Sequence, residues 1–305
     1  MKKRTPPTPG EVRSYLQDRR NWGRWGEKGG AGAINLITPQ KRLEALKLAK
    51  SGRVVSLSKV LPVDPSPQNP RPVQHYMKKH GAKVGQGSSL DYVGIFPHGF
   101  SVTHIDALCH VWDSDGMWDG RDPDKEITFD GARYGSVDAW SDGIITRGVL
   151  LDVPKHRGEP YVTLDSPVHG WELEDILKEE GVSVGAGDAV IVFSGVNAFI
   201  ADHPDAWSEG SDVPGLHASC LPFIRDHDVS VLGWDMADAN PNDSGISMPM
   251  HGVLYSYGVG LLDNARLEPL SEVCSSEGRY EFLLMITPLV LVGGTGSPVN
   301  PIAMF

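Results

Sequence analysis

The hydrophobic pattern of the chain predicts five strands, at residues 53–57, 144–153, 188–194, 229–234 and 283–292. Two of these segments are continuous apolar runs rather than alternations of apolar and polar residues. Such runs are typical of strands that are covered on both faces of a sheet. We therefore expect a sheet that is buried between other elements.

Apolar residues also recur at helical spacing between these strands. Thr38 is suited to cap a helix, Pro39 to occupy its first position and Gly52 to follow its end. Three further helices are predicted at residues 172–180, 218–227 and 267–275. Strands mixed with helices favour an α/β or α+β architecture.

The chain divides into an arm and a body. The first 36 residues are polar and rich in Gly, Trp and Arg, and we expect them to wrap on the body. Residues 37–305 contain no visible interdomain linker and are predicted to form a single domain. Within this domain, residues 62–91 are polar and rich in Pro and Gly. A long structureless segment is typical of a functional lid or of a segment that packs on a partner subunit.

Charge and composition exclude several classes of function. The chain has 28 Lys and Arg residues against 39 Asp and Glu, a net charge of −11, which excludes nucleic acid as the main ligand. The longest apolar stretch, residues 282–292, is about half of a membrane span, and the N-terminus has no apolar signal region. The three cysteines form no C-x-x-C pair, which favours a reducing compartment. We expect a cytoplasmic protein that acts on a small molecule, without a membrane.

Histidines concentrate in one segment, between His98 and His110. On an extended chain His104 and Asp106 point to one face, because the side-chain period of a strand is two. An imidazole nitrogen and a carboxylate oxygen then converge on one point, as a Zn²⁺ or Mn²⁺ ion requires. His110 can reach the same cavity after a turn. The alternative is that these residues lie on the surface or are satisfied polar residues of the core.

The segment Thr103-His104-Ile105-Asp106-Ala107-Leu108-Cys109-His110 resembles the signature of the metal-dependent cyclase family, H-x-G-T-H-x-D-x-P-x-H. This family includes bacterial kynurenine formamidases and isatin hydrolases. Further segments are similar to its longer members, at residues 21–25, 36–39, 214–217, 263–264 and 294–301. The likeness therefore extends over nearly the whole chain.

The resemblance implies an α/β protein with a swivelling β/β/α fold, in which helices flank a mixed sheet and residues 37–305 form the catalytic domain. It also implies that activated water opens an amide, formamide or lactone-type bond in a small cyclic or aromatic substrate. The implied cofactor is a divalent metal ion, Mn²⁺ or Zn²⁺, with one or two ions per chain. Dimers and tetramers are usual among relatives, so we expect a homodimer or homotetramer.

The resemblance further assigns roles to matching residues. His104 and Asp106 are the implied metal ligands, with Asp106 able to bridge two ions, and His110 is the implied general acid and base. The family's second metal site uses a His followed twelve residues later by a carboxylate. His251 and Asp263 stand at that spacing, with Asp in place of the usual Glu.

The chain departs from the family signature at three positions. Phe100, Val102 and Leu108 replace its first His, its Gly and its Pro. Phe100 cannot bind a metal, which leaves three hypotheses. A single ion is held by His104, Asp106 and His251, with Asp263 as a fourth ligand or a neighbour; this arrangement leaves a position open for water and is the one we favour. Alternatively, His98 replaces the missing ligand, or the metal site is lost.

The substrate pocket is predicted less directly. Phe100 and the two tryptophans after the motif, Trp112 and Trp118, are candidates for an aromatic wall. His217, which opens a helix, and Asp235, at a strand end, are further candidates.

Two other functions remain open. Two histidines and a carboxylate also form the Fe(II) site of non-haem oxygenases, and loss of the metal would leave a binding or structural relative.

Overall fold

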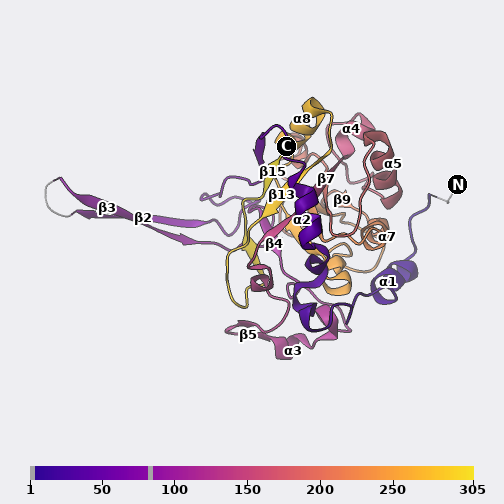
Figure 1. Cartoon of the computed structure of the whole chain (residues 1–305), viewed down its shortest axis with the longest axis horizontal. Helices are drawn as coiled ribbons and strands as arrows, with labels where there is room; N and C mark the ends of the chain where they lie inside the picture. Colours follow the sequence, from indigo (N-terminus) through magenta and orange to yellow (C-terminus); the bar gives the residue numbers. More distant parts are fainter. Residues whose placement is uncertain (1–3, 82–84) are drawn as a thin grey trace.

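A nine-stranded mixed sheet forms the centre of the computed structural model, which describes residues 4–81 and 85–305 (Figure 1). Its strands, in order across the sheet, are β1 (Val54–Ser56), β15 (Ile302–Met304), β13 (Glu281–Ile286), β7 (Ile144–Asp152), β8 (Ala189–Phe193), β10 (Val231–Trp234), β12 (Gly260–Asp263), β4 (His104–Asp106) and β14 (Gly296–Pro298). Strands β7, β8, β10 and β12 run parallel, and the others pair antiparallel. The mixed sheet confirms the predicted α/β class.

Four of the five predicted strands match observed ones, namely β1, β7, β8 and β10. The central strand β8 is buried along its whole length, as a continuous apolar run predicts. The fifth prediction is wrong in its second half, because β13 ends at Ile286. Pro288 follows, and a proline cannot donate a hydrogen bond to a sheet ladder. Residues 289–292 instead form an exposed loop.

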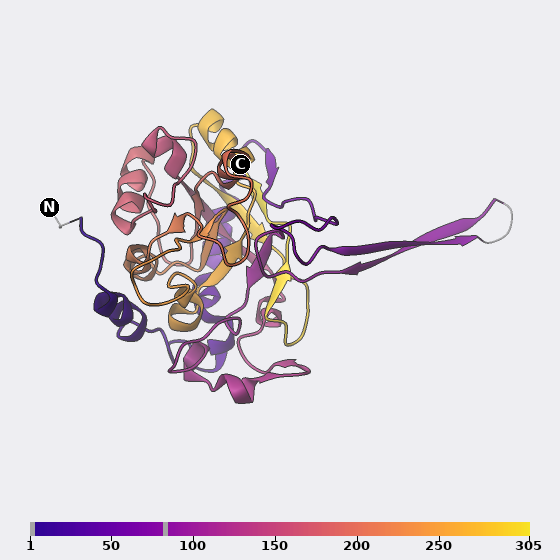
Figure 2. The ribbon, with the colours of Figure 1, turned by 180° about the vertical axis from the view of Figure 1, so that it is seen from behind.

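Helices surround the sheet (Figures 1 and 2). The α-helices are α1 (Pro9–Gln17), α2 (Pro39–Leu46), α3 (Pro123–Glu126), α4 (Val153–Arg157), α5 (Gly170–Glu180), α6 (Val196–Asp202), α7 (Leu221–Asp226) and α8 (Glu268–Glu277). Short helical turns are η1 (Gly26–Leu36), η2 (Trp118–Gly120), η3 (Val137–Trp140), η4 (Ala218–Cys220) and η5 (Val253–Tyr257). The Thr38 side chain caps α2 as predicted, but this helix ends at Leu46 rather than before Gly52. Among residues 4–81 and 85–305, no helix has the length and apolar character needed to cross a membrane.

The predicted N-terminal arm contains a helix of its own and packs on the body. In α1, Val12 and Leu16 are buried. Farther along, the Trp22 indole N–H donates a 2.6 Å hydrogen bond to the carbonyl of Tyr255. This segment therefore contributes side chains to the common core.

The segment predicted to be structureless, residues 62–91, contains most of a β-hairpin. Strands β2 (Gln74–Gly81) and β3 (Gly87–Gly94) pair antiparallel over eight residues each. Figures 1 and 2 show this hairpin projecting away from the body. Two smaller pairs complete the fold: β9 (Gly215–Leu216) with β11 (Ala237–Asp238), and β5 (Ile127–Thr128) with β6 (Gly131–Ala132).

The C-terminal end of α5 holds a carboxyl group that makes stability depend on pH. Within the described ranges, Oε2 of Glu180 is buried and has no hydrogen-bond partner. Burial raises the pKa of this carboxyl to about 8. The pKa of this carboxyl in the unfolded chain is ~4.3. Between about pH 5 and pH 8 the folded state therefore keeps a proton that the unfolded chain has lost. The free energy of unfolding therefore falls as pH rises through this window.

The substitution Glu180→Gln removes this titration. We expect it to raise the free energy of unfolding at pH 8 by about 1 kcal/mol, or Tm by roughly 2–3 °C, and to have little effect at pH 5. Thermal unfolding at pH 5, 6.5 and 8 measures the difference, with the exposed neighbour Glu179→Gln as the control. An equal change in Tm at all three pH values would contradict this explanation.

Candidate metal centre

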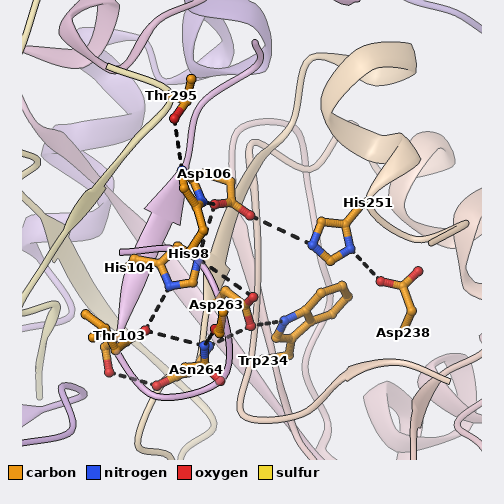
Figure 3. A network of polar contacts seen from close by, with 12 residues as sticks. His98, Thr103, His104, Asp106, Trp234, Asp238, His251, Asp263, Asn264 and Thr295 are labelled. Carbon is orange, nitrogen blue, oxygen red and sulfur yellow. Dashed lines mark hydrogen bonds and ion pairs between the residues drawn. The ribbon is translucent and has the colours of Figure 1, made fainter. Parts of the chain in front are cut away.

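The short strand β4 carries the centre of the site. It lies between β12 and β14, and the register places His104 opposite Asp263 and Asp106 opposite Gly296. The side chain of Ile105 is fully buried in the apolar core, and His104 and Asp106 point to the other side of the strand (Figure 3). The alternation of strand side chains thus brings the two polar groups to one side, as predicted.

Each oxygen of the Asp106 carboxylate faces different imidazoles. Oδ1 lies 2.7 Å from Nδ1 of His98 and 3.2 Å from Nε2 of His104. Oδ2 lies 3.9 Å from Nε2 of His251. This second oxygen is buried, yet it has no hydrogen-bond partner in the described part of the chain. A buried carboxylate oxygen without a partner is costly, so the arrangement favours a further positive group beside it.

The far nitrogen of each imidazole is held by another part of the chain. His104 Nδ1 lies 2.8 Å from the carbonyl oxygen of Val102, and His98 Nε2 lies 3.0 Å from the hydroxyl of Thr295. His251 Nδ1 lies 2.5 Å from the carboxylate of Asp238 (Figure 3). Such contacts fix the ring orientation and turn the other nitrogen of each ring toward Asp106, as is usual for histidines that bind metals.

Asp263 is oriented by donors on one of its two oxygens. Oδ1 accepts hydrogen bonds of 2.7 Å from the Trp234 indole and 2.7 Å from the backbone N–H of Asn264. Oδ2 therefore remains free on the side of His104, whose Nε2 lies 3.8 Å away. Asp263 thus offers a single carboxylate oxygen to the site.

The pKa values show how strongly the site favours positive charge. Burial opposes protonation of His104 and His251, but neighbouring carboxylates outweigh it and raise the pKa of each to about 9. Burial also acts on Asp106, yet the charge on His104 holds the pKa of this carboxyl well below its usual value. The pKa of Asp263 is raised, mainly by burial. Two buried carboxylates thus share a small volume and require cations around them.

The donor atoms fit a divalent metal. Ligand atoms of His98, Asp106 and His110 lie within 4.8 Å of one another, as do those of His104, Asp106 and Asp263. Both groups contain Asp106, and imidazole with carboxylate is a donor set suited to Zn²⁺ or Mn²⁺. Three of the four predicted ligands, His104, Asp106 and Asp263, thus form one group, and the fourth, His251, has its Nε2 3.9 Å from Oδ2 of Asp106. His98 joins them, whereas the prediction that we favoured did not include it.

His110 lies beside these groups. Its ring stacks on the ring of His98 with a centroid distance of 3.8 Å and an interplanar angle of 3°. Burial lowers the pKa of His110 to about 4. The ring is therefore neutral at physiological pH and able to accept a proton.

A cavity of about 340 Å³ opens over the metal-binding groups. Its apolar wall comprises Phe100, Val213, Ala237 and Met248, and its polar wall includes Glu209, Ser211, Asn240 and Ser247. The ring of Phe100 packs against Trp207 at 5.2 Å and does not fill the space between the ligands. Phe100 is thus the one predicted wall residue that lines this cavity.

The other predicted wall residues lie elsewhere. Trp118 is fully buried and donates its indole N–H to the carbonyl of Gly29, while Trp112 is half exposed. His217 caps η4 through its Nδ1 atom. Asp235 accepts the backbone N–H groups of residues 194–196, which begin α6. These corrections have one cause: neighbours of the motif in sequence, or groups at strand ends, need not face the same cavity.

Asp238 is a residue of the candidate site that the sequence did not reveal. The pairing of β11 with β9 buries it beside His251. The Asp-to-His hydrogen bond is formed by residues 13 apart, a spacing without a recognisable pattern. Met248 and Ser247, in the loop before His251, were missed for the same reason.

Asp238→Asn is expected to weaken metal binding about 10- to 100-fold, because the neutral amide orients and polarises His251 less well than the carboxylate does. Titration of the metal-free variant with Zn²⁺ or Mn²⁺ measures the affinity. The control is Asp243→Asn, which changes an exposed carboxylate in the next loop, beside His217. If both variants bind metal equally, Asp238 has no such role.

Comparisons with known proteins identify the family of the chain. A family model described as a putative cyclase matches residues 55–241. The kynurenine formamidase of Bacillus cereus is 24% identical over 200 residues, which cover 61% of this chain and 89% of that protein. The protein of the same name from Bacillus thuringiensis is 25% identical over 194 residues, with the same coverage of 61% and 89%.

Solved structures show the same fold. One described as a novel cyclase superposes with a TM-score of 0.82 at 24% identity, covering 94% of this chain and 99% of that chain. Isatin hydrolase A from Ralstonia solanacearum superposes with a TM-score of 0.55 at 18% identity, covering 87% and 97% of the two chains. The fold predicted by resemblance is therefore confirmed.

Proposed function

Because the chain belongs to the putative cyclase family, we propose that it is a metal-dependent hydrolase that opens an amide, formamide or lactone-type bond in a small substrate. The names of two relatives, kynurenine formamidase and isatin hydrolase, support this class of reaction. The observation that carries the proposal is the buried oxygen Oδ2 of Asp106, which has no hydrogen-bond partner among the described residues.

The two oxygens of Asp106 would each serve one metal ion. His98 and His104 would hold the first ion together with Oδ1, since both rings face that oxygen at 2.7 and 3.2 Å. His251 and Asp263 would hold the second together with Oδ2. Asp106 is then the shared ligand. His98 supplies the imidazole that the family signature places at position 100.

A divalent ion at such a site supplies a nucleophile at neutral pH, by lowering the pKa of water from ~15.7 toward ~7, and polarises the substrate carbonyl. Side chains of the protein transfer the proton and position the ligands. His110 is neutral, accepts a proton from the attacking water and donates it to the leaving nitrogen or oxygen, a transfer worth typically ~10²–10⁴-fold in rate. Asp238 keeps the His251 ring in position throughout.

The cavity supports a small, partly apolar substrate. Its volume of about 340 Å³ lies at the lower end of the range for small-molecule sites. Phe100 and Met248 offer apolar contact, while Asn240 and Ser247 offer hydrogen bonds. We therefore propose an aryl formamide or a bicyclic amide, such as a ring fused to a five-membered lactam, as the substrate class.

The test is hydrolysis of three probes, an aryl formamide, a cyclic aryl amide and an aryl lactone, by protein stripped with a chelator. We expect no turnover without metal and recovery with Mn²⁺ or Zn²⁺. Oxygen uptake by Fe(II)-loaded protein separates this function from an oxygenase and is expected to be absent. Full activity of the stripped protein, or failure of every metal-loaded sample on all three probes, would contradict the proposal.

A further inference from the structure

We infer that Asn264 is a positioning residue that serves the two metal positions by different atoms. Its side-chain amide holds the ligands of the first position, beside Oδ1 of Asp106, and its backbone holds a ligand of the second, beside Oδ2. The inference rests on the proposed function, because it concerns these two positions. Asn264 itself does not line the cavity and is not one of the ligands.

Asn264 combines two features that destabilise a folded chain. It directly follows β12 and is fully buried, and its φ of 53° lies in the left-handed region. Glycine adopts this region without strain, and asparagine is one of the few other residues that tolerate it. Oδ1 of the amide is buried and has no hydrogen-bond partner anywhere in the residues that the structure describes. Glycine would avoid both features, so the presence of asparagine points to a role for the amide N–H groups.

These N–H groups bind the turn that leads into β4. Nδ2 of Asn264 donates to the carbonyl of Gly99 and, at 3.4 Å, to the carbonyl of Val102. Gly99 directly follows His98, and the carbonyl of Val102 also lies 2.8 Å from Nδ1 of His104. One amide therefore fixes the two carbonyls that adjoin the imidazoles of the first metal position. These contacts hold both rings toward the same carboxylate oxygen.

The backbone of Asn264 makes a separate set of contacts (Figure 3). Its N–H donates a 2.7 Å hydrogen bond to Oδ1 of Asp263, which leaves Oδ2 of that carboxylate free for an ion. Its carbonyl accepts a 2.7 Å hydrogen bond from the hydroxyl of Thr103, the residue before His104. Both contacts depend on main-chain atoms and on the left-handed backbone. Neither requires the amide.

Asn264→Gly separates the two sets of contacts. Glycine keeps the left-handed backbone, and with it the hydrogen bond to Asp263, but removes both bonds of the amide. We expect metal affinity at the first position to fall about 10- to 100-fold, as it does when an outer partner of a ligand is lost, and affinity at the second to stay unchanged. Titration of the metal-free, full-length chain with Mn²⁺ in competition with a chelator gives both constants. At equal occupancy of the second position, electron paramagnetic resonance should show isolated Mn²⁺ in place of a coupled pair.

Asn264→Asp distinguishes hydrogen-bond donation from packing. Aspartate fills the same space and tolerates the same backbone, but it replaces the two donors by acceptors. We expect it also to weaken the first position, although its added charge would by itself attract cations. The matched control is Asn35→Gly. The amide of Asn35 likewise binds two carbonyls, those of Lys28 and Gly32 at 2.8 and 2.9 Å, but within η1, so this variant should bind both ions as the wild type does.

A crystal structure of metal-free Asn264→Gly gives a result that needs no ion. We expect Nδ1 of His98 to move out of hydrogen-bond distance of Asp106, from which it lies 2.7 Å in the wild type. Wild-type affinity at both positions in Asn264→Gly, or equal loss at both, would overturn the inference. A wild type that binds no metal would instead contradict the proposed function. In that case the metal-free structure decides: a displaced His98 supports the positioning role of Asn264, and an unmoved His98 overturns it.

Discussion

Asp106→Asn is expected to abolish metal binding at both positions and to lower hydrolysis at least ~10³-fold. Among the described residues, this carboxylate is the group whose two oxygens face both sets of imidazoles, Oδ1 at 2.7 and 3.2 Å and Oδ2 at 3.9 Å. An amide keeps the size of the side chain but removes the negative charge that draws cations into the site. The loss should exceed the ~10–100-fold that follows removal of an outer partner of a ligand. Elemental analysis after gel filtration measures the bound metal.

A matched control is Asp235→Asn. Asp235 is another fully buried aspartate, but it binds the backbone at the start of α6 and does not line the cavity. We expect this variant to have a lower Tm and a normal metal content. Asp106→Asn, in contrast, should lose its metal without a comparable loss of Tm. If Asp106→Asn retains its metal and its activity, the shared-ligand arrangement is wrong.

His98→Ala is expected to reduce the metal content from two ions per chain to one and to lower activity at least ~100-fold. Nδ1 of His98 lies 2.7 Å from Asp106, and its ring forms an edge contact with that of His104 at 5.2 Å. Without it, His104 and Asp106 alone are too few protein ligands for the first ion. The second position, with His251 and Asp263, should remain filled.

A second substitution separates ligand loss from general damage. In the His98→Ala background, Phe100→His restores a histidine where the family signature has one, and we expect it to restore the second ion at least in part. His75→Ala, which changes an exposed histidine of the hairpin, serves as a control. Two ions in the His98→Ala variant would show that His98 is not a ligand.

Much of the fold was predictable because it depends on local patterns. The buried strands β7 and β8 follow from continuous apolar runs, and α5 ends as predicted at Gly181, which has the left-handed backbone that favours glycine. His104 and Asp106 share a face because strand side chains alternate. The hydrolase class and the divalent metal followed from resemblance. The names of the relatives agree with the hydrolase class, and the donor atoms around Asp106 fit a divalent metal.

The rest depends on contacts between residues far apart in sequence. Between His98 and β4 the chain turns at Gly99, whose φ of 119° favours glycine, and the amide of Asn264 binds the carbonyl of Gly99. This turn points His98 at Asp106 and Phe100 at the cavity wall. The role of Asp238 likewise arises from the pairing of β11 with β9. No spacing of residues along the chain predicts these contacts.

The central claim is that two metal ions share Asp106, and anomalous diffraction from crystals grown with Zn²⁺ or Mn²⁺ tests it most directly. The account predicts two peaks, one beside Oδ1 with His98 and His104 and the other beside Oδ2 with His251 and Asp263. Absence of any peak next to Asp106 in metal-saturated crystals would contradict it, as would one ion bound without this carboxylate.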